Sequence, residues 1–247
     1  MTTFSWRSAL EPRANLSNAH SKSGSETRAR ILDAAGPVFA AHGFEGATVR
    51  EICSSAGVNI ASVGYYFGDK LGLYRDVIQQ IRDTRERQFP APHHVPSDPR
   101  LSLHQVVRTI ISRILACDES GWESQVLMRE MQSPTPVFES IVQEFFRPLF
   151  DQLVHALEKL IGQPTPKHTL EQLALSVVGQ CVYYKFGAGV VQILIPEAER
   201  QAHYDIDSLS LHITAVMLAA VDNASVLKQR LEIERLNQVP SPSSSHD

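Results

Sequence analysis

The chain has only three cysteines, Cys53, Cys117 and Cys181, and they lie far apart. An odd number of widely spaced cysteines argues against a disulfide framework and against a zinc site. We expect small buried side chains, with a redox-sensing thiol as the open alternative. The pair His93 and His94 has no further ligands nearby in the sequence, so neither a metal site nor a cofactor is expected.

Long apolar runs are also lacking. No run reaches the roughly 18 residues needed to span a bilayer, and the first residues lack the apolar stretch of a signal peptide. Glycine-rich phosphate loops, metal-ligand spacings and nucleophile motifs are missing too, which argues against an enzyme. We therefore expect a cytoplasmic protein that uses no membrane partner and catalyses no reaction.

Excess positive charge is absent, since the net charge is −4. Counted by segment, however, residues 1–70 carry seven Lys/Arg and six Asp/Glu, so the acidity lies in the rest of the chain. With 43% apolar residues, the 247-residue chain can bury one large core or two modest ones. A nucleic-acid partner would have to be bound through a few well-placed contacts, because the field of residues 1–70 is weak.

The apolar residues recur at helical spacing, and no useful stretch alternates as a strand would, so the predicted fold class is all-α. Gly36 and Pro37 fall inside the first helix, which we expect to bend there. The expected helices span residues 25–42, 48–57, a short stretch after Asn59, 69–89, 101–117, 122–132, 135–161, 169–187 and 206–236. The expected domains are a disordered arm (1–24), a three-helix domain (25–70), a connecting helix (71–89), a proline-rich loop (90–100), a larger helical domain (101–236) and a disordered tail (237–247).

The segment from Thr48 to Lys70, TVREICSSAGVNIASVGYYFGDK, contains the most specific signal. Thr48 and Glu51 fit a capping box at the start of a short helix. Gly57 suits the tight turn that ends this helix, and Asn59 can cap a second one. Two helices joined by such a turn form a helix-turn-helix, although a small helical core can contain the same turn for packing alone.

Spaced matches around this turn resemble the DNA-binding domain of TetR-family transcriptional regulators. The matching residues are TRARILDAA at 27–35, Phe39, Gly43, Phe44, TVREI at 48–52, AGV at 56–58, YYF at 65–67, Lys70 and Leu73. The pattern AGVNIA is similar to the CecR-like subgroup. The segments MREM at 128–131, SPTP at 133–136 and GQCVYY at 179–184 resemble that subgroup's C-terminal domain.

The start of the second short helix should meet base edges in the major groove. Ile60 and Ala61 can touch thymine methyl groups, and Ser62 can hydrogen-bond a base or a phosphate. The resemblance implies a guanine contact for Arg50, with a phosphate contact or a surface ion pair as the alternative. The residues expected to bind phosphates are Thr48, Tyr65, Tyr66 and Lys70.

Gly64 stands where most of the family has tyrosine, and Tyr66 stands where it often has histidine. A glycine inside a helix costs about 1 kcal/mol relative to alanine, and Gly64 offers no side chain to a phosphate. Gly64 and the weak charge are the support for one alternative, a helical interaction protein of this fold that no longer binds DNA. A helical enzyme is the second alternative.

The resemblance implies that residues 101–236 bind a small-molecule effector and form a homodimer. A pocket between helices needs an apolar lining with a few polar anchors. The candidate residues are Met128, Arg129, Glu130, Phe138, Phe146, Gln180, Tyr183 and Tyr184. The alternative is ordinary core packing for the aromatic residues and a structural ion pair for Arg129 and Glu130. The helices near 169–187 and 206–224 are the expected dimer interface, with packing inside one subunit as the alternative. The predicted function is a ligand-responsive regulator that binds double-stranded operator DNA with an inverted repeat. The resemblance implies that this regulator is a repressor.

Overall fold

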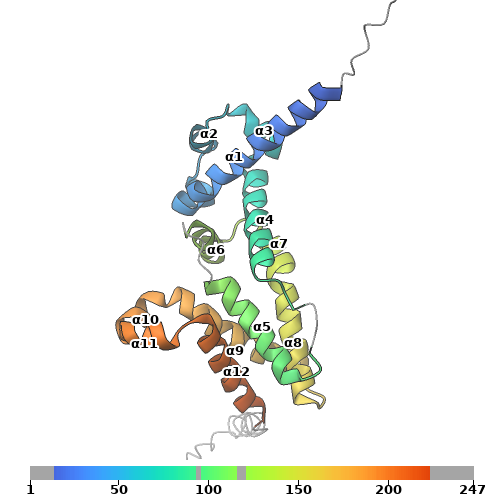
Figure 1. Cartoon of the computed structure of the whole chain (residues 1–247), viewed down its shortest axis with the longest axis vertical. Helices are drawn as coiled ribbons and strands as arrows, with labels where there is room; N and C mark the ends of the chain where they lie inside the picture. Colours follow the sequence, from blue (N-terminus) through green and yellow to red (C-terminus); the bar gives the residue numbers. More distant parts are fainter. Residues whose placement is uncertain (1–13, 93–95, 116–120, 223–247) are drawn as a thin grey trace, which may run out of the picture. The chain divides into compact units, whose positions relative to one another are not determined.

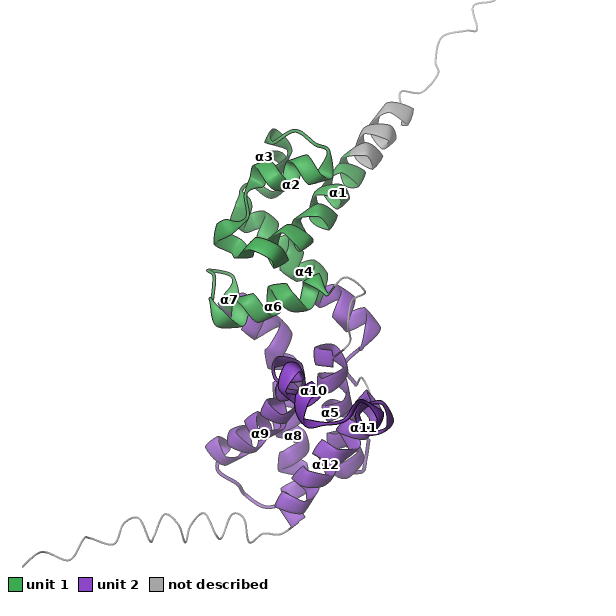
Figure 2. Ribbon diagram, turned by 90° about the vertical axis from the view of Figure 1, so that its left-hand side faces the viewer, with its two compact units in different colours: residues 1–81, 118–138 green, residues 82–117, 139–247 purple. Residues whose placement is uncertain are grey.

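The computed structural model describes residues 14–92, 96–115 and 121–222, with side chains described from residue 24 onward. Across these ranges the chain forms helices and no strands, which confirms the predicted all-α class (Figure 1). The chain divides into two compact units (Figure 2). Unit 1 comprises residues 1–81 and 118–138, and unit 2 comprises residues 82–117 and 139–247.

Unit 1 is built around the buried face of its longest helix. Its helices are α1 (Ala14–Gly46), α2 (Val49–Ala56), α3 (Ala61–Phe67), the first part of α4 (Lys70–Gln88) and α6 (Trp122–Gln132). Phe39 packs edge-on against Tyr74 with ring centroids 4.8 Å apart, and Phe44 lies beside both rings, 5.1 Å from Tyr74 and 6.4 Å from Phe39. These rings join the end of α1 to α4 in one core, together with Ile31, Ile52 and Leu73, each fully buried.

Helix α1 differs from its prediction at two places. It begins at Ala14 instead of Ser25, so the predicted disordered arm is wrong for residues 14–24, while residues 1–13 lie outside the described part of the chain. No proline follows Pro12 until Pro37, and extending an existing helix is far easier than starting one. The helix runs through Pro37, and its non-helical backbone lies at Gly43 (φ 71°, ψ 175°).

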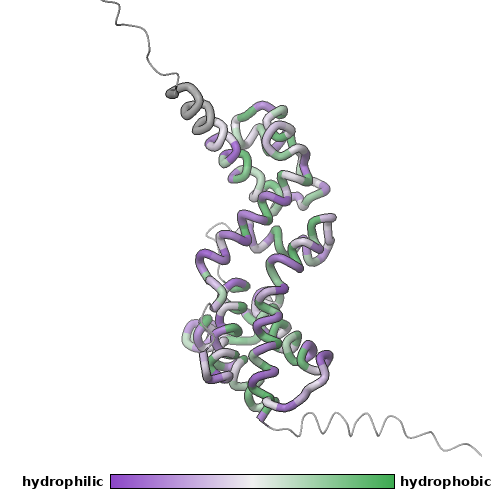
Figure 3. Tube along the Cα trace, turned by 90° about the vertical axis from the view of Figure 1, so that its right-hand side faces the viewer, coloured by the Kyte–Doolittle hydropathy of each residue, from purple (hydrophilic) through white to green (hydrophobic). Residues whose placement is uncertain are grey.

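Unit 2 is a bundle of longer helices around one apolar core. Its elements are the last part of α4, α5 (Pro99–Leu115), α7 (Phe138–Ile141, which starts at the boundary), η1 (Val142–Phe146), α8 (Arg147–Ile161), α9 (Lys167–Phe186), α10 (Ala188–Leu194), α11 (Glu197–His203) and α12 (Ile206–Asp222). α5 packs on α8, α9 and α12. In Figure 3 the helices show alternating hydrophobic and hydrophilic stretches, as expected of helices with one buried face.

Several predicted helices in this half have different bounds in the structure. The helix predicted at 135–161 starts at Phe138 and contains a π-helical turn at Val142–Phe146. The helix predicted at 206–236 is described as far as Asp222, and the predicted tail at 237–247 lies outside the described residues. Helices α10 and α11 were not predicted, because each has seven residues, too few to show a helical period.

The predicted domain boundaries also differ from the units. α6 was placed in the larger domain at 101–236, but the structure groups residues 118–138 with unit 1. The reason is direct packing of α6 on α1, where the ring of Trp122 lies against Gly36. The other boundary falls inside α4, so the helix predicted as a connection belongs partly to each unit.

Two of the three cysteines can be located. Cys53 and Cys181 are buried free thiols, which confirms the prediction of small buried side chains for them, whereas Cys117 lies outside the described residues. Burial raises the pKa of the Cys53 thiol and raises that of Cys181 to about 12.

In the described ranges no single helix is both long and apolar enough to cross a membrane. Two pairs of helices pass that test together by length and composition only: α9 with α10, and α11 with α12. The members of these pairs are bent by 75° and 76° relative to each other.

Candidate nucleic-acid interface

The turn between α2 and α3 has the geometry that its sequence predicts. The Thr48 hydroxyl accepts a hydrogen bond from the Glu51 backbone N–H at 3.2 Å and so caps the start of α2. Gly57 takes the left-handed conformation (φ 63°, ψ 41°), and the N–H of Val58 reaches the Cys53 carbonyl at 3.0 Å. The capping box is half formed, since the Glu51 carboxylate lies 3.1 Å from His42 Nε2.

Arg30, which sequence reasoning did not single out, fixes the other end of α2. From α1 its guanidinium donates hydrogen bonds to the carbonyls of Ala56 at 2.5 Å and Gly57 at 3.2 Å. The last carbonyls of a helix lack partners within the helix and attract positive charge. Arg30 therefore sets the angle at which the chain leaves α2, and no local sequence signal pointed to a partner 26 residues away.

Helix α3 presents an exposed face opposite one buried anchor. The Asn59 side chain caps it by accepting a hydrogen bond from the Ala61 N–H at 2.9 Å, as predicted. Val63 is buried, whereas Ile60 is 56% exposed and Tyr65 is 83% exposed. Ala61 is also exposed, and Ser62 is half-buried. The isoleucine that precedes α3 and the tyrosine within it are therefore both left in water.

The predicted phosphate-binding residues have different surroundings. Tyr65 and Tyr66 pack edge to face with ring centroids 4.8 Å apart, so the exposed ring is held by its neighbour. Lys70 instead donates hydrogen bonds to the carbonyls of Glu45 at 3.3 Å and Ala47 at 3.2 Å. Its ammonium also lies 4.6 Å from the centre of the Phe44 ring. These contacts leave Lys70 less donor capacity for DNA than the sequence suggested.

Arg28 is also held by internal contacts, whereas Arg50 is not. Arg28 forms an ion pair with Asp76 at 2.5 Å and lies over the Phe67 ring. Arg50 is exposed on α2. Among the described residues of 24–70 it is the cation with no hydrogen bond or ion pair, which fits the predicted role of Arg50 as the contact to DNA.

A cavity of about 450 Å³ lies in unit 1 beside the end of α1 and the loop after α6. Two predicted pocket residues, Arg129 and Glu130, line it. Arg129 donates hydrogen bonds to the carbonyls of Ala40 at 2.7 Å and Ala41 at 2.9 Å, which caps the helix before its break at Gly43. These bonds differ from both roles expected for Arg129, which were a ligand contact and an ion pair with Glu130.

Glu130 is 2% exposed, and its carboxylate is satisfied by protein donors. One oxygen accepts from the Tyr74 hydroxyl at 2.7 Å, and the other accepts from the Thr135 N–H and hydroxyl at 2.8 and 2.9 Å. Burial, followed by the Glu130 contact, raises the pKa of Tyr74 far above its usual range. This carboxylate therefore joins α6 to α4 within unit 1.

The predicted effector pocket is divided between the two units. Met128, Arg129, Glu130 and Phe138 belong to unit 1, whereas Phe146, Gln180, Tyr183 and Tyr184 belong to unit 2. Tyr183 is 53% exposed, and Tyr184 is half-buried beside Tyr204. Tyr183 therefore lies on the surface of the bundle, and the single pocket stays a prediction.

Comparison with known families agrees with these observations. The family of bacterial regulatory proteins named after tetR matches residues 31–77. The C-terminal domain of the HTH-type transcriptional dual regulator CecR matches residues 99–221. The dual regulator CecR of Shigella flexneri is 27% identical over 176 residues, which cover 66% of this chain and 78% of CecR. The repressor BepR of Brucella suis is 30% identical over 127 residues, covering 44% of this chain and 60% of BepR.

Solved structures share the fold at low identity. The superantigen PfiT has a TM-score of 0.58 at 17% identity, covering 77% of this chain and 95% of PfiT. A transcriptional regulator from Rhodococcus sp. Rha1 has a TM-score of 0.53 at 22% identity, covering 81% of this chain and 95% of that regulator. At such identities these matches define the architecture alone.

The fold and the α2–α3 turn define a helix-turn-helix transcriptional regulator. The chain belongs to the TetR family, and its C-terminal half is CecR-like. It is a ligand-responsive DNA-binding regulator and not an enzyme; regulators of this family bind operator DNA and act as dimers that respond to small molecules.

Proposed function

We propose that the protein acts in the cytoplasm as a homodimer that represses transcription from an inverted-repeat operator and is released by a small molecule. The observation that carries the DNA-binding part is the exposed face of α3, with Ile60 and Tyr65 in water and Val63 buried beneath them. A helix so presented can enter a major groove while its buried residue keeps it on the domain.

The proposed base contacts come from Ile60, Ala61 and Ser62 at the start of α3, together with Arg50 on α2. Apolar side chains of this size fit thymine methyl groups, and an arginine can bind guanine through two hydrogen bonds. Thr48, Tyr65, Tyr66 and the remaining donor of Lys70 are proposed to reach phosphates. Since donors of Arg28, Arg30 and Lys70 already bind groups of the domain itself, most of the charge contact is proposed to come from Arg50.

Dimerisation is supported by an exposed stripe on each of two helices of unit 2. On α9 the exposed residues recur at steps of three and four, and they include Leu175 (58% exposed) and Tyr183 (53%). On α12 they include Leu211 (60%) and Val216 (42%). Two such helices from each subunit would form a four-helix interface, and a two-fold axis would present α3 twice to DNA.

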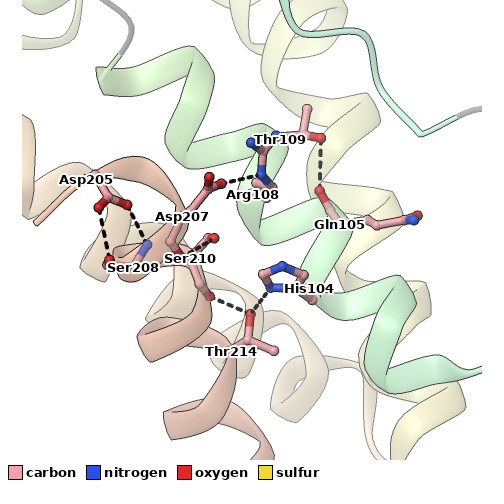
Figure 4. A network of polar contacts seen from close by, with 9 residues as sticks. All are labelled: His104, Gln105, Arg108, Thr109, Asp205, Asp207, Ser208, Ser210 and Thr214. Carbon is pink, nitrogen blue, oxygen red and sulfur yellow. Dashed lines mark hydrogen bonds and ion pairs between the residues drawn. The ribbon is translucent and has the colours of Figure 1, made fainter. Parts of the chain in front are cut away.

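Side-chain contacts to α5 hold α12 in place with its exposed stripe facing outward. His104 Nδ1 lies 3.2 Å from the Thr214 hydroxyl, which donates to the Ser210 carbonyl at 2.7 Å (Figure 4). Arg108 binds the Asp207 carboxylate at 2.7 Å on the same side. These contacts hold one face of α12 against the bundle, so the opposite face is available to a second copy.

The effector is proposed to be a small molecule with both apolar and polar groups. The cavity beside Arg129 and Glu130 supports this choice, because Phe44 and Pro134 line it together with polar side chains. A ligand seated there would touch the end of α1 and Tyr74 of α4, two elements that support the helix-turn-helix. Any ligand that binds one arrangement of these helices better than another shifts the balance between them.

The DNA-binding proposal is tested by fluorescence anisotropy with the DNA upstream of the protein's own gene, measured at several salt concentrations. We expect sequence-selective, salt-dependent binding, and a loss of affinity of at least about fivefold for Arg50→Ala, since a bidentate base contact contributes about 1–3 kcal/mol. Arg87→Ala removes an exposed arginine from unit 2 and should bind like the wild type. Unselective binding by the wild type would refute the function, and an unchanged Arg50→Ala variant would refute the site.

A further inference from the structure

An apolar surface of unit 2 lies on α10, a helix that the proposed four-helix interface does not use. Ile193 is 87% exposed, Leu194 is 69% exposed and Val190 is 48% exposed. No other large apolar side chain among the described residues is as exposed as Ile193. Three apolar side chains in water on one seven-residue helix form a patch that a free surface rarely keeps.

The geometry of the chain makes α10 stand out from the bundle. α9 and α10 are bent by 75° relative to each other at Gly187. A methyl group on Gly187 would lie 2.8 Å from the Tyr183 carbonyl oxygen and 2.9 Å from its ring, so only glycine fits this bend. Pro196 then separates α10 from α11, and Arg200 of α11 donates to the Ile195 carbonyl at 3.1 Å. The glycine before α10 and the hydrogen bond after it therefore fix the direction of this helix.

The apolar surface of α10 continues that of α9. Tyr183 and Phe186 are exposed in the last turn of α9, and Val190 lies four residues after Phe186, beyond the bend at Gly187. In Figure 1, α10 and α11 extend to one side of unit 2, and in Figure 2, which views that side, they lie in front of the bundle. A partner that covers the stripe of α9 would meet α10 at its edge.

We propose that α10 is a dimerisation arm, whose Val190, Ile193 and Leu194 pack on unit 2 of a second copy of this chain. The inference rests on the proposed dimer through α9 and α12 and extends that interface. A stable homodimer commonly buries more than about 2,000 Å² of largely apolar surface, and an arm from each copy adds apolar area at two symmetric places. The surface of α11 is mostly polar, so the apolar patch of the arm is confined to α10.

The test is the dimer dissociation constant of Ile193→Gln/Leu194→Gln, measured by analytical ultracentrifugation on the full chain. Both side chains are in water in one copy, so the monomer should fold as before, and glutamine keeps the helix propensity. We expect the dissociation constant to rise at least tenfold. Leu101→Gln is the matched control, because Leu101 is an exposed apolar residue on α5 (47% exposed), and it should leave the constant unchanged.

A second variant separates this inference from the proposed function. Leu211→Gln/Val216→Gln on α12 tests the four-helix interface itself. If the wild type is monomeric, both proposals fail. If the α12 variant dissociates while the α10 variant dimerises like the wild type, only the arm is refuted. If the α10 variant lowers the thermal stability of the monomer and leaves dissociation unchanged, α10 is covered by its own chain and the arm is again refuted.

Cross-linking gives a direct reading of what α10 touches. A photo-reactive phenylalanine analogue in place of Ile193 should give a covalent dimer on illumination, whereas the same analogue in place of Leu101 should give monomer. Absence of a covalent dimer from position 193, under conditions where the protein is dimeric by ultracentrifugation, would overturn the inference.

Discussion

The indole ring of Trp122 on α6 occupies the space that a side chain at Gly36 on α1 would need. A methyl group at position 36 would lie 2.5 to 2.7 Å from three carbons of the ring, which is far inside van der Waals contact. The pair explains why a glycine precedes Pro37 in the middle of a helix. It also explains why α6 groups with the DNA-binding helices.

Gly36→Ala should therefore destabilise unit 1, although alanine is the better helix former. The propensity gain is about 1 kcal/mol, and overpacking costs about 1–3 kcal/mol. In a Trp122→Leu background the clash is removed, and the same change should stabilise. Urea unfolding of the wild type, the two single variants and the double variant measures the coupling free energy between positions 36 and 122. Equal effects of Gly36→Ala in both backgrounds would show that the ring and the glycine do not interact.

Tyr74→Phe should destabilise unit 1 by about 1–3 kcal/mol, because it leaves a buried carboxylate oxygen of Glu130 without its donor. The raised pKa of Tyr74 means that its hydroxyl stays protonated, so the contribution of this bond to stability is fully present below about pH 10 and is lost as the pH rises toward the folded pKa. Thermal unfolding measures the loss. Tyr65→Phe is the matched control, since that hydroxyl is on an exposed ring, and its stability should equal that of the wild type.

Gly64→Ala should stabilise the protein by about 1 kcal/mol, because Gly64 lies inside helix α3 and a methyl group there meets nothing within 4 Å. Gly68→Ala provides the comparison. It also has free space around the new methyl group, but its φ of 79° is strained for alanine, so it should destabilise. Denaturant unfolding compares the two. Equal effects would mean that backbone conformation does not distinguish these positions.

The Cys181 thiol should resist alkylation in the native state. Its pKa is raised to about 12, so the thiolate fraction near neutral pH is very small, and the side chain is fully buried. With Cys117→Ser to remove the third thiol, native protein should react slowly with iodoacetamide at pH 8 and rapidly after denaturation. Mass spectrometry locates the label. Prompt native labelling of Cys181 would support a redox-active thiol instead.

The caps and turn of the helix-turn-helix were predictable because they are local. Thr48, Gly57 and Asn59 act on backbone groups within about one helical turn, and their residue types match the conformations they adopt. The phosphate role of Lys70 was predicted from its residue type, yet its ammonium lies among the carbonyls of Glu45 and Ala47. Those carbonyls are more than 20 residues away in the chain, so no local pattern contained this contact.

The residues predicted for the effector pocket also make contacts that are distant in the chain. Arg129 and Glu130 were candidates because charged groups amid apolar residues suggest anchors for a ligand. In the structure Arg129 caps the carbonyls of Ala40 and Ala41, and Glu130 binds Tyr74. The buried carboxylate of Glu130 needs partners, and the sequence cannot say whether they come from a ligand or from another helix.

The sequence by itself determined the helical class, the helix-turn-helix and the membership of the TetR family, because helical period, caps and spaced motifs act over short distances. The tertiary structure decided which basic residues remain available to DNA, which helices α6 joins, and which apolar faces stay in water. Those outcomes depend on contacts between residues far apart in the chain. Packing of Trp122 on Gly36 and exposure of Ile193 on α10 are two results that only the folded chain could show.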